Sequence, residues 1–293
     1  MINKYIKLID EKLEEFMPIN YPQKIFKAMK YTVTLKGKRL RPIMCLETCK
    51  MFGGKIEDAI STACAIEMLH AQTLIHDDLP CMDNDMYRRG KLTNHMVFGE
   101  ANAVLAGDAL LTFAPQTILK NSKHLGAEKL IKIMEEYFHA AGAYGVIAGQ
   151  VVDIESEQFE ITEDDDQLPE ILEYIHTHKT ADLFKLALRT GAIIADATDE
   201  QIKDITEFGQ YMGVAFQIAD DILDVTSTFE EMGKTLGKDE AAGKLTYVNL
   251  YGLEKSKEDL NKLIDNCFEI LNRHNLKSEV FEEILNKIKK AGR

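Results

Sequence analysis

The sequence predicts an all-α protein, a single-domain antiparallel bundle of helices, and three observations support this fold class. Apolar residues recur at helical spacing over most of the chain, strand-like alternation is scarce, and only six prolines interrupt 293 residues. Hydrophobic residues make up 45% of the chain, which suits a large packed core. Because no segment resembles an interdomain linker, we expect one domain over residues 1–293.

The first expected helix is amphipathic and covers residues 2–16, where apolar residues from Ile2 to Phe16 recur on one face between Asp, Glu and Lys. Residues 56–76 form an almost continuous run of apolar and small residues with few helix breakers. This run is too long for a typical strand, so it predicts a buried helix.

The rest of the chain shows the same helical periodicity. Further helices are expected over residues 102–119, 127–152, 166–195, 199–225 and 254–274, followed by a short charged helix at the end. Breaks are expected around Gly37 and in the polar or glycine-rich segments 52–54, 82–95, 162–169 and 231–244.

The charge balance limits the possible partners. With 48 acidic and 35 basic residues the net charge is −13, which argues against binding of nucleic acid or of an anionic membrane surface. An anionic substrate would therefore need local Lys/Arg clusters or bound cations. The five cysteines show no Cys-x-x-Cys pairing, no segment resembles a signal peptide, and no run reaches the ~18 apolar residues of a membrane span. We expect a cytoplasmic protein without stable membrane insertion.

Two aspartate clusters each follow an apolar helical stretch. They comprise Asp77, Asp78, Asp83 and Asp85 in the first, and Asp220, Asp221 and Asp224 in the second. Asp220 and Asp224 are four residues apart, so on a helix they project from one face and repel each other. A bound cation would relieve this repulsion, and Mg²⁺ fits because it takes one or two protein carboxylates and fills its other positions with water or phosphate oxygens.

The first cluster is less regular. Asp77 and Asp83 are six residues apart, which on an unbroken helix would turn them onto different faces. Pro80 disrupts the helix, and we expect the segment to bulge so that both carboxylates return to one side. His70, Thr73 and Asp77 form a polar stripe on the otherwise apolar helix, which indicates a cavity beside it.

Basic residues supply what an anionic substrate would need, because Arg offers a planar fork for phosphate oxygens and Lys a mobile charge. They are found in the 37–42 segment GKRLRP, at Arg88 and Arg89, and at Lys179, Lys234, Lys238 and Lys244.

At these motifs the sequence closely resembles the trans-prenyl diphosphate synthases, in particular the bacterial farnesyl and geranylgeranyl diphosphate synthases. The matching segments are GKRLRP at 37–42, the block at 74–111 that contains HDDLPCMDND, HTHKT at 176–180, FQIADDILD at 216–224 and GKTLGKDEAAGKLTY at 233–247. The resemblance implies the isoprenoid synthase fold, helices around a central cavity, and a homodimer.

The resemblance also implies a site that holds three Mg²⁺ against an allylic diphosphate. The implied metal ligands are Asp77, Asp83 and Asp220, supported by Asp78, Asp221 and Asp224. The implied isopentenyl diphosphate site is Lys38, Arg41, His70 and Arg89, and the positions around the allylic substrate are Arg88, Lys179, Thr180, Gln217, Lys234 and Lys244. Met86 departs from the family pattern, which commonly has an acidic residue there.

The implied reaction ionises the allylic carbon–oxygen bond, adds the isopentenyl double bond to the cation, and loses a proton. The expected catalytic residues are Asp77, Asp83, Lys179, Thr180, Gln217 and Asp220. In this family the bulk just before the first aspartate motif sets product length, here at Gln72 and Thr73. Farnesyl diphosphate is the first expectation, and geranylgeranyl diphosphate is the alternative.

Two other classes of function compete with this reading. A helical metal-dependent phosphohydrolase is suggested by the adjacent His76 and Asp77, but it requires histidine ligands, and the other histidines lie near no second acid cluster arranged for such a site. A non-enzymatic helical scaffold would leave the paired aspartate clusters on apolar helices unexplained.

Overall fold

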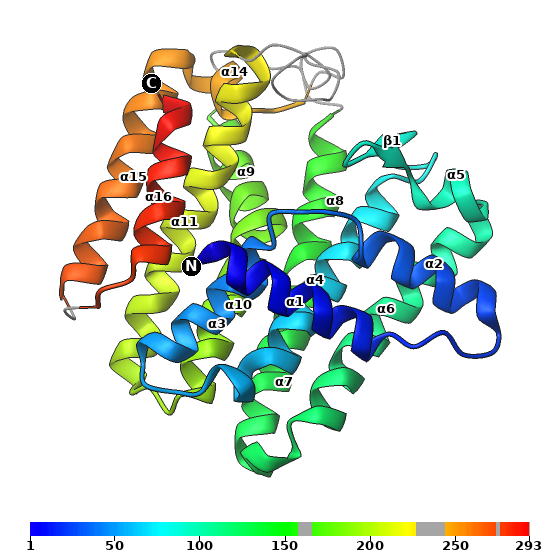
Figure 1. Ribbon diagram of the computed structural model, residues 1–293. Helices are drawn as coiled ribbons and strands as arrows, with labels where there is room; N and C mark the ends of the chain where they lie inside the picture. Colours follow the sequence, from blue (N-terminus) through cyan, green and yellow to red (C-terminus); the bar gives the residue numbers. More distant parts are fainter. Residues whose placement is uncertain (158–165, 227–243, 274–275, 293) are drawn as a thin grey trace. The chain divides into compact units, whose positions relative to one another are not determined.

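The computed structural model describes residues 1–157, 166–226, 244–273 and 276–292, and nearly all of the regular structure in these ranges is helical (Figure 1). The chain forms two compact units, which are described here separately. The first unit is Met1–Tyr137 with Thr190–Ala197, and the second is Phe138–Arg189 with Thr198–Arg293. The prediction of an all-α fold is confirmed.

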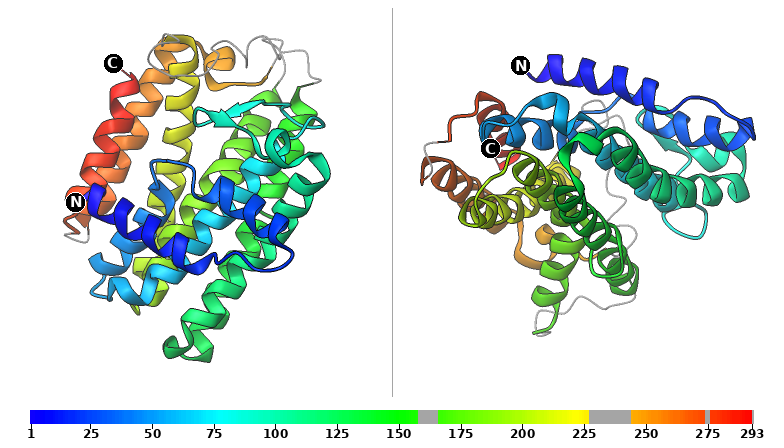
Figure 2. Two further views of the ribbon diagram at one scale, coloured as in Figure 1. Left: turned by 45° about the vertical axis from the view of Figure 1, so that its right-hand side comes forward. Right: turned by 90° about the horizontal axis from the view of Figure 1, so that it is seen from below.

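The first unit is built around one buried helix, α4. Its helices are α1 (Ile2–Phe16), α2 (Gln23–Val33), α3 (Leu40–Met51), α4 (Ile56–Asp77), α5 (Asn94–Phe98), α6 (Glu100–Asn121), the short η1 (Lys123–Leu125) and most of α7 (Ala127–Ala141). Helices α1, α2, α3 and α6 all contact α4, and the two long helices α4 and α6 lie side by side (Figure 2). Because neighbours cover α4 on several sides, its sequence is an almost continuous apolar run.

The second unit is built around α11 (Asp199–Thr226). Its other elements are α8 (Val146–Ser156), α9 (Leu168–Ile175), η2 (His176–Ala181), most of α10 (Asp182–Ile194), α14 (Tyr247–Tyr251), α15 (Leu253–Arg273), α16 (Glu279–Lys289) and η3 (Lys290–Gly292). Helices α15 and α16 lie beside α11 (Figure 1), and Phe208 of α11 packs edge-on against Phe281 of α16 with ring centroids 5.2 Å apart. Aromatic pairs in this geometry stabilise a core beyond the area that they bury.

Most of the expected helices are present, but the single helix predicted over residues 127–152 is wrong. Helix α7 ends at Ala141 and α8 begins at Val146. Gly142 and Gly145 lie in the turn between them, and the amide of Gly145 donates to the carbonyl oxygen of Gly142. A Cβ atom on Gly145 would overlap the carbonyl oxygen of Ala140, so this turn requires glycine and interrupts the helix.

The helix predicted over residues 166–195 is continuous from Leu168 to Ile194, but its middle turn, η2, is a π-helix. Such wide turns occur mostly as single turns inside α-helices and often at functional sites. Helices α2 and α3 and the two-residue strands β1 (Tyr87–Arg88) and β2 (Lys91–Leu92) were not among the expected elements.

All five cysteines are free thiols, and Cys81 is the exposed one. The other four are buried. In the described part of the chain, no helix combines the length and the hydropathy needed to cross a membrane.

Candidate functional site

The first aspartate cluster begins where α4 ends. The helix stops at Asp77, and Pro80 follows three residues later. The chain then folds back, so that the backbone amide of Asp83 donates to the carbonyl oxygen of Asp77 at 2.9 Å. The expected return of Asp83 toward Asp77 is therefore present in the backbone, and it is made by a hydrogen-bonded turn after the helix.

Asp78, the next residue, is buried and held by a guanidinium group. Both Nε and Nη2 of Arg88 lie 2.6 Å from Asp78 Oδ1, and the same Nη2 lies 3.7 Å from Asp85 Oδ2. Burial raises the pKa of Asp78 to about 7, against the opposing effect of the Arg88 charge. The carboxylate of Asp78 is therefore engaged by Arg88, and its supporting role at the metal stays a prediction.

Arg88 and its neighbour Arg89 lie in a tight β-hairpin, at a strand position and at a turn position. Tyr87 pairs with Leu92 and Arg88 with Lys91, which leaves Arg89 and Gly90 as the two turn residues. Both have positive φ, 53° and 73°, as the two-residue turn that suits twisted strands requires. The hairpin thus presents Arg88 from a strand and Arg89 from the turn.

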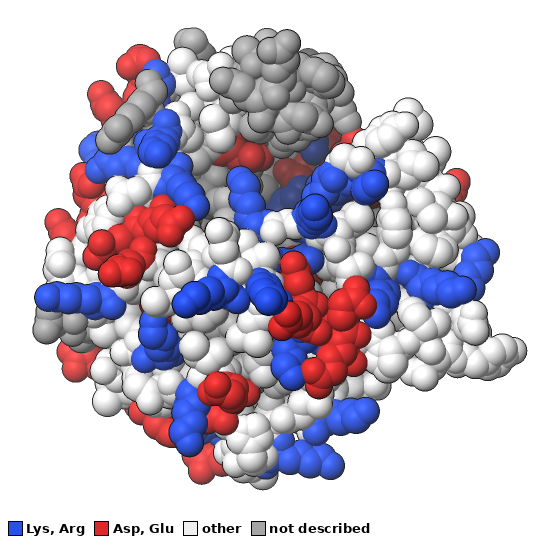
Figure 3. Space-filling model, viewed as in Figure 1, with Lys and Arg blue, Asp and Glu red and all other residues white. Residues whose placement is uncertain are grey.

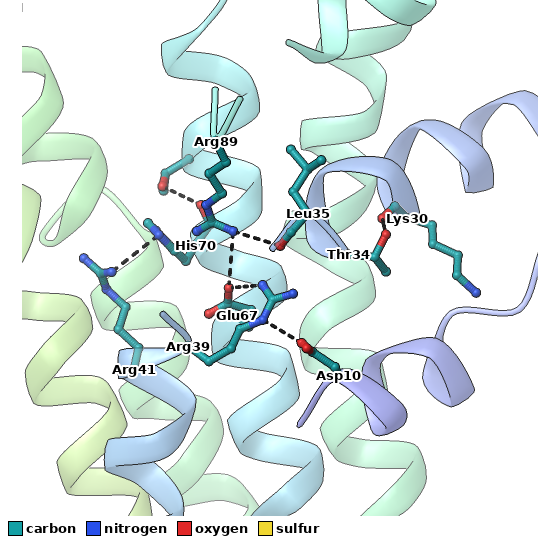
Figure 4. Close-up of polar contacts among 10 residues, drawn as sticks. Asp10, Lys30, Thr34, Leu35, Arg39, Arg41, Glu67, His70 and Arg89 are labelled. Atoms are coloured by element: carbon teal, nitrogen blue, oxygen red, sulfur yellow. Dashed lines mark hydrogen bonds and ion pairs between the residues drawn. The ribbon is translucent and has the colours of Figure 1, made fainter. Parts of the chain in front are cut away.

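Arg89 belongs to a cluster of basic side chains around the middle of α4 (Figure 4). Arg41 of α3 lies with Nη1 3.4 Å from Nε2 of His70, which is on α4. Burial and the surrounding guanidinium charges hold the pKa of His70 well below its usual range, so its ring is neutral at pH 7. Lys38, the fourth residue expected in this group, is exposed just before α3.

Gln72 and Thr73, the expected chain-length residues, also lie on α4. The Gln72 side chain is buried, and its Nε2 lies 3.1 Å from Nδ1 of His76. Thr73 donates its hydroxyl to the carbonyl oxygen of His70 at 2.9 Å. The Gln72 side chain is therefore held by a neighbour one helical turn away.

The second aspartate cluster lies at the end of α11 in the second unit. Asp220 and Asp224 are both partly exposed and one helical turn apart, as the sequence predicted. Asp221 is buried, and its two oxygens accept hydrogen bonds from Gln217 Nε2 at 3.0 Å and from the backbone amide of Tyr247 at 2.8 Å. His176 Nε2 lies 3.8 Å from the same carboxylate.

Three of the expected substrate-binding residues lie close together at the π-helical turn of the second unit. Lys179 forms a short ion pair with Asp153 of α8, and the Thr180 hydroxyl donates to Gln217 Oε1 at 3.0 Å. A Cβ atom on Gly149 of α8 would overlap the Lys179 amide nitrogen and lie 2.8 Å from its Cα. Glycine at this position therefore lets α8 approach the backbone that carries Lys179.

The remaining predicted residues are Lys244 and Lys234. Lys244 Nζ lies 3.7 Å from Glu157 Oε1. Lys234 falls in 227–243 and is outside the residues that the structure describes, as is Lys238. Met86, where the family commonly has an acid, is exposed.

Local charge matters more than net charge on the face shown in Figure 3. Lys and Arg side chains are interspersed there with Asp and Glu, although the chain carries a net charge of −13. An anion can therefore meet positive side chains locally. Within the described ranges, no three His, Cys, Asp or Glu residues gather into a group that could hold a metal ion. Pairs such as Asp220 and Asp224 fit Mg²⁺, which accepts few protein ligands and completes its shell with water or phosphate oxygens.

Several polar residues of these sites escaped the analysis of the sequence. Arg39 and Glu67 are buried beside the basic cluster, and Asp153 holds Lys179. Glu67 had a visible signal, because it is a lone acid inside an apolar helical run, and Asp153 is the first acid after the apolar run that opens α8. Arg39 had none apart from its place in GKRLRP.

Comparison with known proteins identifies relatives over most of the chain. The polyprenyl synthetase family model matches residues 22–288. Geranylgeranyl pyrophosphate synthase 7 of Arabidopsis thaliana, a chloroplastic protein, is 46% identical over 263 residues, which are 90% of this chain and 75% of the relative.

Two solved structures share the fold. A farnesyl/geranylfarnesyl (FPP/GFPP) synthase from Zymomonas mobilis superposes with a TM-score of 0.82 at 31% identity, covering 100% of this chain and 96% of that one. A geranyltransferase from Helicobacter pylori, complexed with magnesium and isoprenyl diphosphate, has a TM-score of 0.82 at 32% identity, covering 99% and 96%.

Proposed function

The chain belongs to the polyprenyl synthetase family and is a trans-prenyl diphosphate synthase, and from this premise we propose that it joins isopentenyl diphosphate to allylic diphosphates and releases diphosphate. Asp77, Asp83 and Asp220 are the proposed metal ligands, with Asp224 in support. The observation that carries the assignment is the pairing of acids: Asp83 turns back to Asp77 after α4, and Asp220 and Asp224 share one face of α11.

The proposed cofactor is Mg²⁺, three ions per site, and its use is supported by the magnesium named for the Helicobacter pylori relative. Bound magnesium supplies positive charge that stabilises the departing diphosphate. Arg88 and Lys179 add fixed positive charge, and each is oriented by a carboxylate, Asp78 and Asp153. These ion pairs hold the side chains in place before substrate binds.

The proposed partners of the allylic cation are the oxygens of Thr180 and Gln217. In the structure the Thr180 hydroxyl donates to Gln217 Oε1, which fixes the direction of both side chains. Both groups carry partial negative charge and are poor nucleophiles, so they can stabilise a cation without capturing it. Apolar helix faces exclude the water that would quench the cation.

Activity is tested by incubating the protein with radiolabelled isopentenyl diphosphate and dimethylallyl, geranyl or farnesyl diphosphate, with and without Mg²⁺. Asp77→Ala should lose at least about a hundredfold in turnover, because it removes a metal ligand. Its helical circular dichroism should be unchanged, because the substitution relieves charge repulsion in the folded protein. Asp108→Ala, which changes an exposed acid of α6, is the matched control. Near-normal turnover by Asp77→Ala rejects the site.

The product is proposed to have fifteen or twenty carbons. Farnesyl diphosphate is supported by the FPP/GFPP synthase of Zymomonas mobilis, and geranylgeranyl diphosphate by the names of several plant relatives from Arabidopsis thaliana and Catharanthus roseus. Gln72→Tyr should shorten the products by adding bulk at the expected floor of the tail pocket. Thr117→Val, which changes a buried residue of the neighbouring helix α6, is a control that should leave chain length unchanged. Unaltered products from Gln72→Tyr contradict the placement.

We also propose that the protein is a homodimer, that it is cytoplasmic and that the chain is a single domain. These three proposals follow from the resemblance and the sequence. Light scattering coupled to size exclusion tests the dimer. A mass of one chain, 33.1 kDa, contradicts it.

A further inference from the structure

Glu67 is a buried carboxylate in the middle of α4, with a side chain only 3% exposed. An ionised carboxylate in such a place is costly unless cations and hydrogen bonds compensate it. Its Oε1 lies 2.6 Å from Nη1 of Arg39 and 3.9 Å from Nη1 of Arg89 (Figure 4). One oxygen is therefore shared between two guanidinium groups that come from different elements.

Arg39 is the fixed member of this arrangement. Its side chain is 1% exposed, and its Nε donates to Asp10 Oδ1 of α1 at 2.8 Å while Nη1 donates to Glu67. Its backbone is left-handed, with φ 50°, a conformation that non-glycine residues adopt only when their surroundings enforce it. Arg39 therefore ties α1, α3 and α4 together, and two sides of its guanidinium group are already engaged by protein carboxylates.

Arg89 is the member that remains partly open, with a side chain 23% exposed. Its Nη1 donates to the carbonyl oxygen of Leu35 at 3.4 Å, and a Cβ atom on Gly37 would lie 2.7 Å from the same nitrogen. The loop before α3 and the Glu67 carboxylate thus hold the Arg89 guanidinium group from different sides. Its position depends on both.

Glu67 also supplies the negative charge that this basic cluster needs. Burial lowers the pKa of Arg41 to about 10, and the Glu67 charge acts in the opposite direction on Arg41 and on Arg89. The guanidinium groups also lower one another's pKa, as Arg89 does for Arg41. Without Glu67 the guanidinium groups of the cluster would still repel one another, and the carboxylate that offsets this repulsion would be lost.

We infer that Glu67 is a positioning residue for isopentenyl diphosphate, which acts by sharing Oε1 between the fixed Arg39 and the partly open Arg89. The inference rests on the proposed function, in which Arg89 binds isopentenyl diphosphate. It adds a residue that touches no substrate but sets where the Arg89 fork lies. A charge-assisted contact to a planar guanidinium group fixes direction as well as distance, which a diphosphate site requires.

The test is Glu67→Gln, measured by steady-state kinetics with each substrate varied in turn. A glutamine side chain keeps the volume and can still accept from Arg39, but it removes the charge that holds Arg89. We expect the KM for isopentenyl diphosphate to rise about tenfold, with kcat and the KM for the allylic substrate within about twofold of wild type. A merely structural role would change kcat and both KM values together, or only the thermal stability.

Two matched controls are needed. One tests whether neutralising any buried carboxylate has the same effect, and the other tests whether the effect arises through Arg39. Glu47→Gln neutralises another buried carboxylate of the first unit, which accepts from the Tyr5 hydroxyl at 2.6 Å. Asp10→Asn changes the other carboxylate partner of Arg39, which pairs with Arg39 Nε. Both variants should keep the wild-type KM for isopentenyl diphosphate, within about twofold.

Arg89→Gln provides the decisive background. If Glu67 acts through Arg89, adding Glu67→Gln to Arg89→Gln should raise the KM by less than a further twofold. A full tenfold effect in that background, or an unchanged KM in the single variant, overturns the inference. Gly37→Ala should give the same KM pattern by crowding Arg89 from the loop, and it tests the idea independently should Glu67→Gln fail to fold.

The wild-type assay keeps this result separate from the proposed function. If wild type consumes no isopentenyl diphosphate, the proposed function fails, and calorimetric titration with inorganic diphosphate then tests the inference alone. Binding should weaken about tenfold in Glu67→Gln and be unchanged in Glu47→Gln. Equal binding by both variants rejects the role of Glu67.

Discussion

Asp78 and Asp221 occupy the same place in their two Asp-Asp pairs, yet different kinds of donor hold them. Asp78 lies against the charged guanidinium group of Arg88, ten positions along the chain. Asp221 accepts from the Gln217 amide and from the backbone of Tyr247, 26 positions away. The first contact compensates a charge and the second fixes a geometry, so the two clusters should respond differently to substitution.

The cationic side chains near the two clusters also differ in what surrounds them. In the first unit, side chains and a loop hold the end of the Arg89 side chain, which can shift when it is crowded. In the second unit, the backbone of Lys179 itself lies against Gly149 of α8. A flexible tip can yield at little cost, whereas two packed backbones cannot.

The largest effect is expected from Gly149→Ala. Its new Cβ atom would overlap the Lys179 backbone, so α8 or the π-helical turn must move, at a cost of about 3 kcal/mol. The better helix propensity of Ala returns only about 1 kcal/mol of this. Gly37→Ala, whose Cβ atom meets the tip of Arg89, should cost less than about 1 kcal/mol. Urea unfolding compares the two, and equal losses would remove the distinction between tip and backbone contacts.

A smaller effect is expected from Arg88→Met, which leaves Asp78 without its guanidinium partner. Because Arg88 is partly exposed, we expect a loss of about 2 kcal/mol at pH 8, less than for a fully buried pair. Asp78→Asn in the same chain should recover part of the loss, since it removes the stranded charge. Unfolding by urea without Mg²⁺ measures both variants.

The loss in Arg88→Met should also depend on pH. Burial raises the pKa of Asp78 to about 7 from 3.8, although the Arg88 charge lowers it. Removal of Arg88 should therefore raise the pKa of Asp78 further. The folded protein therefore binds more protons than the unfolded chain between about pH 4 and pH 7, and its stability falls as pH rises through that window. The loss in the variant should be smaller at pH 6 than at pH 8. A loss that grows on acidification contradicts this account.

The contrast between the clusters also shows how far the sequence could predict the molecule. The long helices were predictable because α4 carries an extended apolar pattern with few breakers and α11 keeps its pattern through Gly209 and Gly213. The turn after α4 was predictable from Pro80 and the six-residue spacing of Asp77 and Asp83. The break at 142–145 was missed because two glycines inside an apolar pattern are tolerated in many helices, and only tertiary packing decides their conformation.

The partners of the site residues were harder to predict than the residues themselves. Arg88 and Asp221 were named, but their contacts join segments whose approach depends on the hairpin and on the start of α14. Arg39 was read only as part of a basic motif, although the structure buries it between Asp10 and Glu67. Periodicity gives the face on which a side chain lies, whereas an ion pair between helices depends on tertiary structure.

The smallest effect is expected from Asp221→Asn, and it sharpens the comparison most directly. Asparagine can still accept from the Tyr247 amide, but its NH₂ group would face the NH₂ group of Gln217. The Gln217 amide must then turn, and the Thr180 hydroxyl would accept where it now donates. We expect a loss of about 1 kcal/mol and a fall in kcat of about fivefold, because the fold is kept and only the direction of these polar groups changes. Asp259→Asn, which also contacts Tyr247, is the control and should keep wild-type kcat. Asp220→Asn, which changes a proposed metal ligand, gives the comparison. If Asp221→Asn is as inactive as that variant, Asp221 acts at the metal, and the Gln217 and Tyr247 amides serve to orient its carboxylate as a metal ligand.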